Sequence, residues 1–555
     1  MQFDFSYGGD STVKNGVDRT AMSFSPDTLR QPTFFRGKLR KALAFREAIS
    51  ALHDVVVSDL RWKPKDRTAY LRWRASREET DLAGIAARRK EAADRIKEIR
   101  AEIKNLDDQS FQRRKPYLDA RGAYFQYLLK RDFQAWIVLD PVVTVHPDQV
   151  FFECFSQDES SYGRLAAHYD VFEDVGEFAC GTTNVDYSDA LHDEFQKIRS
   201  YKTTTLAIDP GGFEVATSGE VTHKEVKIDL PDTWVRGFLQ VSSAMALPAL
   251  TFRLHPMDVH NICLVLRRHK ELVGPRALRY RLEPGRPVRV VFEPWGYEVT
   301  CPRSVYEGDV ADEVRVWGRR RLLTLERLVP VARSFTVHLL GKGMPSFYLA
   351  DLGDLSYTLG LSGWTRNDWS GAGNFDLLAP RAEVDEVTLR RVFAALSESW
   401  SATADGLARR LDLDRAVVLG ALSAYTQAGR AVYDLENRCY RLRELTREPL
   451  PMDRLRFGNE REAHATRFLD RGAVELIATD EDDRGVSLLG LVRQGETPRE
   501  PWLRVDRDER VVDARCTCNF YQQNRLRKGP CEHILALRLL HARRLRASAA
   551  LAGVS

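Results

Sequence analysis

Cys516-Thr517-Cys518 is followed, after a polar and basic insert, by Cys531-Glu532-His533. The loop between the C-x-C and C-x-H pairs is short enough to wrap around one metal ion. Three thiolates and one imidazole suit tetrahedral zinc, and all four ligands come from the protein. A C-x-C pair alone is also typical of two buried cysteines on a strand, but a C-x-H at this distance favours a metal. The spacing therefore predicts a structural zinc site, because no coordination position remains for water.

This pattern resembles the SWIM zinc finger, whose signature is C-x-C followed at a variable distance by C-x-H. Strand-like runs at 486–494 and 502–514 precede the motif, and a helix over 534–546 is predicted to follow it. The resemblance implies an interaction module that binds DNA or proteins. It also implies one structural Zn²⁺ ion, held by Cys516, Cys518, Cys531 and His533.

Length and composition indicate several ordinary globular domains. The chain has 555 residues, 43% hydrophobic and 29% charged, with a net charge of +4. Such a small net charge means that partners have to be inferred from local clusters. No apolar run approaches the roughly 18 residues that span a bilayer, so no membrane partner is expected. The first residues lack a secretory signal, and the cysteines outside the motif are scattered singly, so a reducing cytoplasm is expected.

Changes in hydrophobic periodicity predict a multidomain α+β protein. An N-terminal arm covers 1–35, a helical region with a heptad segment 36–135, and a strand-rich α+β region 136–382. A winged-helix-like domain covers 383–447 and the zinc module 448–555.

The region 36–135 is predicted to begin with a helix over 38–52 and a hairpin over 55–74. Apolar residues from Leu82 to Leu106 then recur in alternating steps of three and four, as in a heptad seam. This segment is either one arm of an intramolecular helical hairpin that returns through 117–133, or a parallel coiled coil that dimerises the protein. We favour the helical hairpin, because only about four heptads are present.

The central region shows strand patterns on either side of turn signals. Strands are predicted at 137–145 and 150–155, around His146-Pro147-Asp148, and at 288–292 and 297–301, around Pro294-Trp295-Gly296. A helix is predicted over 256–270. These patterns fit two α+β domains or one large domain.

Three helices and a hairpin between 387 and 442 resemble a winged helix-turn-helix. Ser401 is the predicted N-cap of the second helix, Asp414 that of the third, and Gly429 its C-terminal end. Leu407, Leu411, Val418, Leu422 and Tyr425 are spaced to share one core. The wing contributes Arg438, Arg441 and Arg443 as candidate phosphate contacts, although the third helix offers few groups suited to base edges.

Cations gather around the zinc motif with Glu532 as their only acidic neighbour. A metal-stiffened loop and a basic helix can neutralise phosphates, although a charge run is also typical of a solvated helix face. The candidate nucleic-acid contacts are Arg525, Arg527, Lys528, Arg538, Arg543 and Arg544.

Enzyme motifs are missing from the sequence: there is no P-loop, no strand-associated G-x-G-x-x-G and no G-x-S-x-G. The leading hypothesis is therefore a non-enzymatic zinc-binding adaptor that binds nucleic acid, DNA before RNA, and scaffolds a larger complex. The rival is a purely protein-binding subunit, because the size and the C-terminal position of the motif resemble bacterial SWIM proteins that accompany MoxR-type AAA+ ATPases and von Willebrand A domain proteins. A third hypothesis is an enzyme of unrecognised type in the central region.

Overall fold

The computed structural model describes 12–15, 19–24, 33–58, 141–184, 196, 198–200, 203–208, 232–269, 277–341, 343–363, 369, 375–379, 384–445, 460–483, 485–494, 497–507 and 510–552. All of these residues belong to one compact unit of the chain. The predicted heptad segment, its returning helix and most of the predicted hairpin over 55–74 lie outside the described residues.

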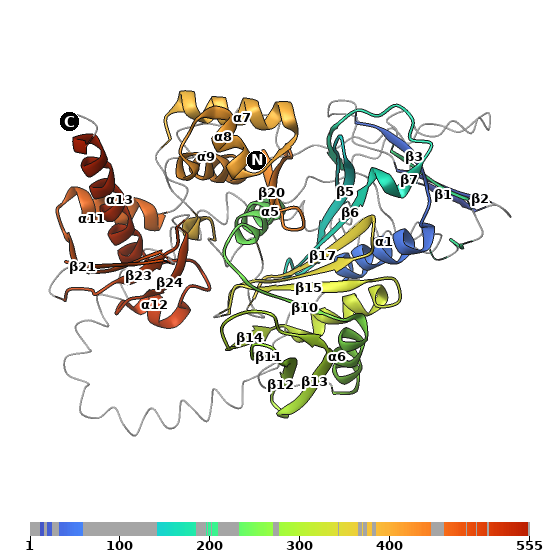
Figure 1. Cartoon of the computed structure of the whole chain (residues 1–555), viewed down its shortest axis with the longest axis horizontal. Helices are drawn as coiled ribbons and strands as arrows, with labels where there is room; N and C mark the ends of the chain where they lie inside the picture. The colour runs from blue at the N-terminus through green and yellow to red at the C-terminus, as the bar shows by residue number, and fades with distance from the viewer. Residues whose placement is uncertain are drawn as a thin grey trace, which may run out of the picture. The chain divides into compact units, whose positions relative to one another are not determined.

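An eight-stranded antiparallel sheet forms the centre of this unit (Figure 1). Its strand order is β10-β15-β16-β17-β6-β5-β4-β8. The predicted hairpin around His146-Pro147-Asp148 is confirmed, because Val145 pairs with Val150. The strands are β4 (Val142–Val145), β5 (Gln149–Phe155), β6 (Ser161–His168), β8 (Gly181–Asn184), β10 (Leu250–Leu254), β15 (Ser334–Leu339), β16 (Ser346–Asp351) and β17 (Leu355–Leu361).

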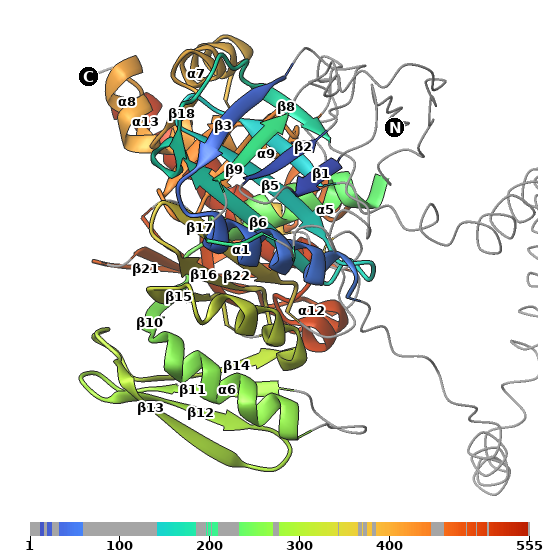
Figure 2. The same cartoon turned by 90° about the vertical axis from the view of Figure 1, so that its right-hand side faces the viewer.

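Helices cover both faces of the middle of this sheet. Every residue of β5 is buried, which requires cover on both sides because successive side chains point to opposite faces. On one face, Cys154 lies 3.5 Å from the carbonyl of Leu52 in α1 (Ala42–Val56). On the other, the Phe155 ring lies 4.7 Å from that of Phe238 in α5 (Asp232–Met245). Figure 2 shows α1 lying along β6 and β17.

A second antiparallel sheet has the order β13-β12-β11-β14. Its strands are β11 (Ala277–Leu282), β12 (Pro287–Phe292), β13 (Tyr297–Val305) and β14 (Asp312–Trp317). Helix α6 (Pro256–Arg268) packs on this sheet, with the 3-10 helix η2 (Arg319–Leu328) beside it (Figure 2). The hairpin around Pro294-Trp295-Gly296 and the helix predicted from Pro256 are both confirmed.

The N-terminal segment differs from its prediction. Instead of a loose arm, it contributes β1 (Thr12–Asn15), β2 (Arg19–Phe24) and β3 (Phe35–Leu39) to a sheet with β7 (Phe172–Glu173) and β9 (Thr203–Ile208). Strand β2 pairs with β9, a distant partner that local periodicity cannot reveal. The helix begins at Ala42 and not at Lys38, and it includes Val55 and Val56, which were predicted to start a strand.

Between 384 and 445 the predicted helices and hairpin are present. They are α7 (Glu386–Ser399), α8 (Ala404–Leu411), α9 (Arg415–Gln427), β18 (Ser401–Ala402), β19 (Ala431–Asp434) and β20 (Cys439–Leu442). Leu407, Val418, Leu422 and Tyr425 are buried in one core, and Leu411 packs against it. Asp414 caps α9 as predicted, but the N-cap of α8 is Thr403, because Ser401 pairs with β20 instead. The winged-helix assignment itself stays a prediction.

The C-terminal module is a four-stranded antiparallel sheet covered by helices (Figure 1). Its elements are α11 (Glu460–Asp470), β21 (Val474–Asp482), β22 (Gly485–Val492), β23 (Trp502–Val505), β24 (Val511–Arg515), α12 (Asn519–Asn524) and α13 (Glu532–Ala552). One hydrophobic cluster runs from the eight-stranded sheet through α5 into this module, from Phe151 through Phe238 to Ile534.

No helix among the described residues is long and apolar enough to cross a membrane.

Candidate metal centre

The ends of three elements bring the four predicted ligands together. Cys516 directly follows β24, Cys518 is the N-cap of α12, and Cys531 directly precedes α13, whose first turn contains His533. All four side chains are buried, and their ligand atoms lie within 4.8 Å of one another. Thiolates in a tetrahedral site sit about 2.3 Å from zinc, so ligand atoms this close fit a single ion.

The imidazole of His533 offers one nitrogen to that ion. Its Nε2 donates a hydrogen bond to Oε1 of Gln494 at 2.7 Å. Its Nδ1 is buried and has no hydrogen-bond partner among the described residues. A buried unpaired nitrogen is costly, and coordination of a metal would remove that cost. The four residues therefore fit zinc, with Nδ1 of His533 as the coordinating nitrogen.

A second layer of contacts orients the imidazole. Gln494 also donates to Oε1 of Glu532 at 3.3 Å, and Oε2 of Glu532 pairs with Nδ1 of His464 at 2.7 Å. The Phe468 ring stacks on His533 with centroids 5.5 Å apart. Such outer contacts fix the ring orientation of metal-binding histidines. Gln494 and Phe468 were not predicted, because no residue pattern marks a contact formed between separate elements.

The crowded thiols favour one thiolate before any metal binds. Hydrogen bonds from Cys516 and Cys531 lower the pKa of Cys518 below its ordinary value, and the backbone N–H of Tyr521 points at the same sulfur from 3.4 Å. The bond to Cys518 raises the pKa of Cys516 to about 11, and burial raises that of Cys531. Zinc must displace these protons, so the binding of zinc releases protons.

Residues 500–539 match the family model of the SWIM zinc finger. This module is a SWIM zinc finger. No curated protein matches the chain. Among solved structures, the crystal structure of Proliferating Cellular Nuclear Antigen from Entamoeba histolytica is similar at 8% identity, over 59% of this chain and 98% of that one, with a TM-score of 0.32. A TM-score this low does not establish a shared fold.

The cations predicted around the SWIM motif differ in their surroundings. Arg525 and Lys528 are exposed on the loop, and Arg543 and Arg544 are exposed on α13. Arg543 lies 3.6 Å from Asp470. Arg527 is half-buried and donates to the carbonyls of Gln523 and Asn524.

The surroundings of Arg538 argue against its place in the predicted set of nucleic-acid contacts. Its side chain is only 7% exposed, and its guanidinium donates to the carbonyls of Leu377 at 3.0 Å and Ala379 at 2.7 Å. The guanidinium is therefore engaged by the protein backbone, and the cavity that Arg538 also lines contains Asp482, Asp483 and Asp506, which do not favour a phosphate. Its role is to hold α13 of the SWIM module against 375–379.

Two of the three predicted wing arginines are also buried. Arg441, 2% exposed, donates to Asp434 at 2.6 Å and to Asp148 at 2.8 Å. Arg443, 1% exposed, donates to Glu153 at 3.0 Å. Both therefore attach the β19–β20 hairpin to the eight-stranded sheet, and neither is available to a phosphate.

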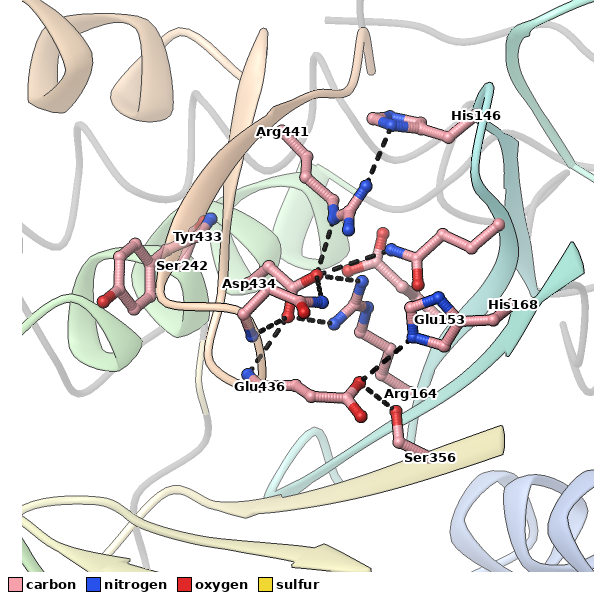
Figure 3. Close-up of polar contacts among 12 residues, drawn as sticks. His146, Glu153, Arg164, His168, Ser242, Ser356, Tyr433, Asp434, Glu436 and Arg441 are labelled. Carbon is pink, nitrogen blue, oxygen red and sulfur yellow. Dashed lines mark hydrogen bonds and ion pairs between the residues drawn. The ribbon is translucent and has the colours of Figure 1, made fainter. Parts of the chain in front are cut away.

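Asp434 lies at the centre of this network. Figure 3 shows its carboxylate between the guanidiniums of Arg441 and Arg164. Burial opposes the ionisation of Asp434, but the charges of Arg164 and Arg441 outweigh burial and hold its pKa below the ordinary range. The hairpin is thus held by charges that are paired inside the protein.

Proposed function

We propose that this protein is a non-enzymatic, zinc-organised adaptor whose SWIM module binds nucleic acid, DNA before RNA, and joins it to a larger assembly. The exposure of Arg525 and Lys528 on the zinc-held loop carries the proposal. A loop fixed at both ends by metal ligands presents its cations without a large loss of conformational entropy on binding. Arginine and lysine side chains on such a loop contact phosphates, and these contacts do not distinguish one base sequence from another.

The surroundings of Arg525 support this role. Arg525 and Arg527 line a groove of about 670 Å³ together with Trp317 and Met344. Arg525 has a φ of 51° and a ψ of −138°, a positive-φ conformation that is unfavourable for a residue with a Cβ. Unfavourable backbone conformations of this kind cluster at functional sites. Arg543 and Arg544 are two further exposed cations of the module, on α13.

The test is a titration of labelled duplex DNA and RNA with the full-length zinc-loaded protein at several salt concentrations. The double variant R525A/K528A is expected to bind more weakly, and the slope of log affinity against log salt should fall by roughly 1–2. The matched control is R286A/R390A, which removes two other cations whose side chains are 75% and 77% exposed. Absence of binding even at low salt, or equal effects of the two double variants, would contradict the proposal.

A protein-binding subunit is the second candidate, with the MoxR-type AAA+ and von Willebrand A assemblies as the expected setting. Strand β21 favours it, because β21 is an edge strand of the SWIM sheet and carries Ile477 with 56% exposure. An open edge with an exposed apolar side chain suits the addition of a strand from a partner. Co-purification with Ile477→Lys distinguishes the two candidates: loss of a protein partner with unchanged affinity for nucleic acid would favour this one.

A further inference from the structure

A groove away from the SWIM module combines a polar floor with converging arginines. It has a volume of about 840 Å³, and its floor is formed by β10, β15 and β16. Thr251 and Arg253 of β10 pair with His338 and Thr336 of β15, so these side chains share one face of the sheet. The neighbouring Phe252 and Leu254 are buried on the other face.

The groove has an excess of positive charge. Arg253, Arg303, Arg333 and Arg438 line it from four separate segments of the chain. The groove is also lined by the acids Glu307, Asp351 and Glu436, so its arginines outnumber its carboxylates by one. Asp351 accepts a bond from the backbone of Gly353, and Glu436 accepts one from Ser356. Arg303 lies 4.0 Å from Asp258. Among the described residues, Arg253 and Arg438 have no ion-pair partner. Like charges gathered in one groove repel, which favours an anion that neutralises them.

Arg438 is the wing arginine that stays exposed, and its backbone is unusual. Its φ is 51°, in the left-handed region that glycine adopts without steric cost. The buried Asp434 holds the turn by accepting from the backbone N–H groups of Glu436 at 3.1 Å and Asn437 at 3.2 Å. An arginine in this position costs stability that a glycine would not, which is expected where the guanidinium itself is needed.

The charge of Arg438 acts on His338, a buried histidine that lines the same groove. This histidine is 7% exposed, and its Nδ1 lies 3.1 Å from the hydroxyl of Thr251. Its Nε2 has no hydrogen-bond partner within the described part of the chain. Burial first, and then the charge of Arg438, lowers the pKa of His338 to about 4. His338 is therefore neutral at pH 7 and adds no positive charge to the groove.

We propose that this groove binds a small phosphorylated ligand of about nucleotide size, with Arg438 and Arg253 on its phosphate. Guanidinium groups donate to phosphate oxygens in pairs, and arginines from several segments can surround one phosphate. The volume lies within the roughly 300–1,000 Å³ of small-molecule sites. This site is independent of the nucleic-acid surface proposed for the SWIM module.

The test is calorimetric titration of the full-length zinc-loaded protein with inorganic phosphate, adenosine monophosphate and adenosine triphosphate. Arg438→Gly relieves the left-handed backbone, so it is expected to raise the melting temperature or leave it unchanged while weakening binding at least about tenfold. Arg253→Gln is expected to weaken binding as well. Equal affinity for all three probes would identify phosphate as the recognised group, and tighter binding of the nucleotides would add recognition of the rest of the ligand.

The matched control is Asp412→Gly. Asp412 also has a φ of 51°, but it does not line this groove. Its replacement also puts a glycine at a positive-φ position and should leave binding unchanged. No binding of any probe to the wild-type protein, or unchanged binding by both Arg438→Gly and Arg253→Gln, would overturn the proposal. Competition by duplex DNA that is lost in Arg438→Gly would also overturn it, because the groove would then be part of a nucleic-acid surface.

Discussion

The carboxylate of Asp434 in the β19–β20 hairpin lies 3.3 Å from the guanidinium of Arg164 in β6, and both side chains are buried. These two charges join the hairpin to the eight-stranded sheet. Arg441 completes the cluster from the neighbouring strand. The position of the exposed Arg438 at the tip of the same hairpin depends on this internal ion cluster.

Asp434→Asn is expected to be strongly destabilising. The change leaves Arg164 and Arg441 buried with less negative charge, and breaking a buried pair in this way costs roughly 3–5 kcal/mol. Denaturant unfolding of the full-length protein measures the loss. The control is Glu386→Gln, which breaks an exposed pair with Arg390 and should cost under about 1 kcal/mol. Equal losses in the two variants would contradict a structural role for the cluster.

Removal of zinc is expected to loosen more than the SWIM module. Leu535 and Ala536 of α13 share a cluster with Leu377, and Arg538 binds the carbonyls of Leu377 and Ala379. In Cys518→Ser, hydrogen exchange should therefore increase in the module and in 375–379, while β11–β14 stay protected.

Cys180→Ser is the control for the zinc prediction, because Cys180 is half-buried and lies outside the cluster of ligands. It should leave both the zinc content and the exchange pattern unchanged. Full protection of 375–379 in Cys518→Ser would mean that the module does not support this segment.

Gln494→Leu is expected to lower zinc affinity about 10- to 100-fold while the fold is kept. The amide oxygen of Gln494 orients His533 through its Nε2, and contacts of this kind affect metal affinity to that extent. Competition with a chromophoric chelator measures the affinity. Gln523→Leu, a change at an exposed glutamine of the same module, should have no effect. An unchanged affinity in Gln494→Leu would show that Gln494 does not orient the ligand.

The stability of the β4–β5 hairpin region should fall below neutral pH because of His146. Burial lowers the pKa of this histidine from 6.5 to about 4, and its Nε2 donates to the carbonyl of Leu442 at 2.6 Å. The unfolded chain binds the proton first, so the contribution is complete above pH 6.5 and is lost as the pH falls towards 4. At pH 5 the loss amounts to about 2 kcal/mol.

Unfolding free energies at pH 7 and pH 5 test this expectation. In His146→Gln the difference between the two pH values should be smaller than in the wild-type protein by about that amount. A pH dependence that is identical in the two proteins would mean that the pKa of His146 is the same in the folded and unfolded states.

Local patterns predicted much of the secondary structure. The hairpins around His146-Pro147-Asp148 and Pro294-Trp295-Gly296 were predictable because turn residues separate apolar runs. The strand at Arg19–Phe24 was missed because its partner β9 is distant in sequence. The misplaced N-cap at Ser401 has a similar cause, since pairing with β20 outweighs a local preference.

The sequence by itself determined the zinc ligands, because a metal requires particular side chains at short spacings and those spacings are visible in the chain. Only the tertiary structure decided which cations are available to a partner. Arg438, Arg441 and Arg443 look alike in sequence, yet the first is exposed and the other two are buried against Asp434 and Glu153. The physical reason is that burial and ion pairing depend on residues brought from distant strands, whereas coordination in this SWIM module depends on neighbours along the chain.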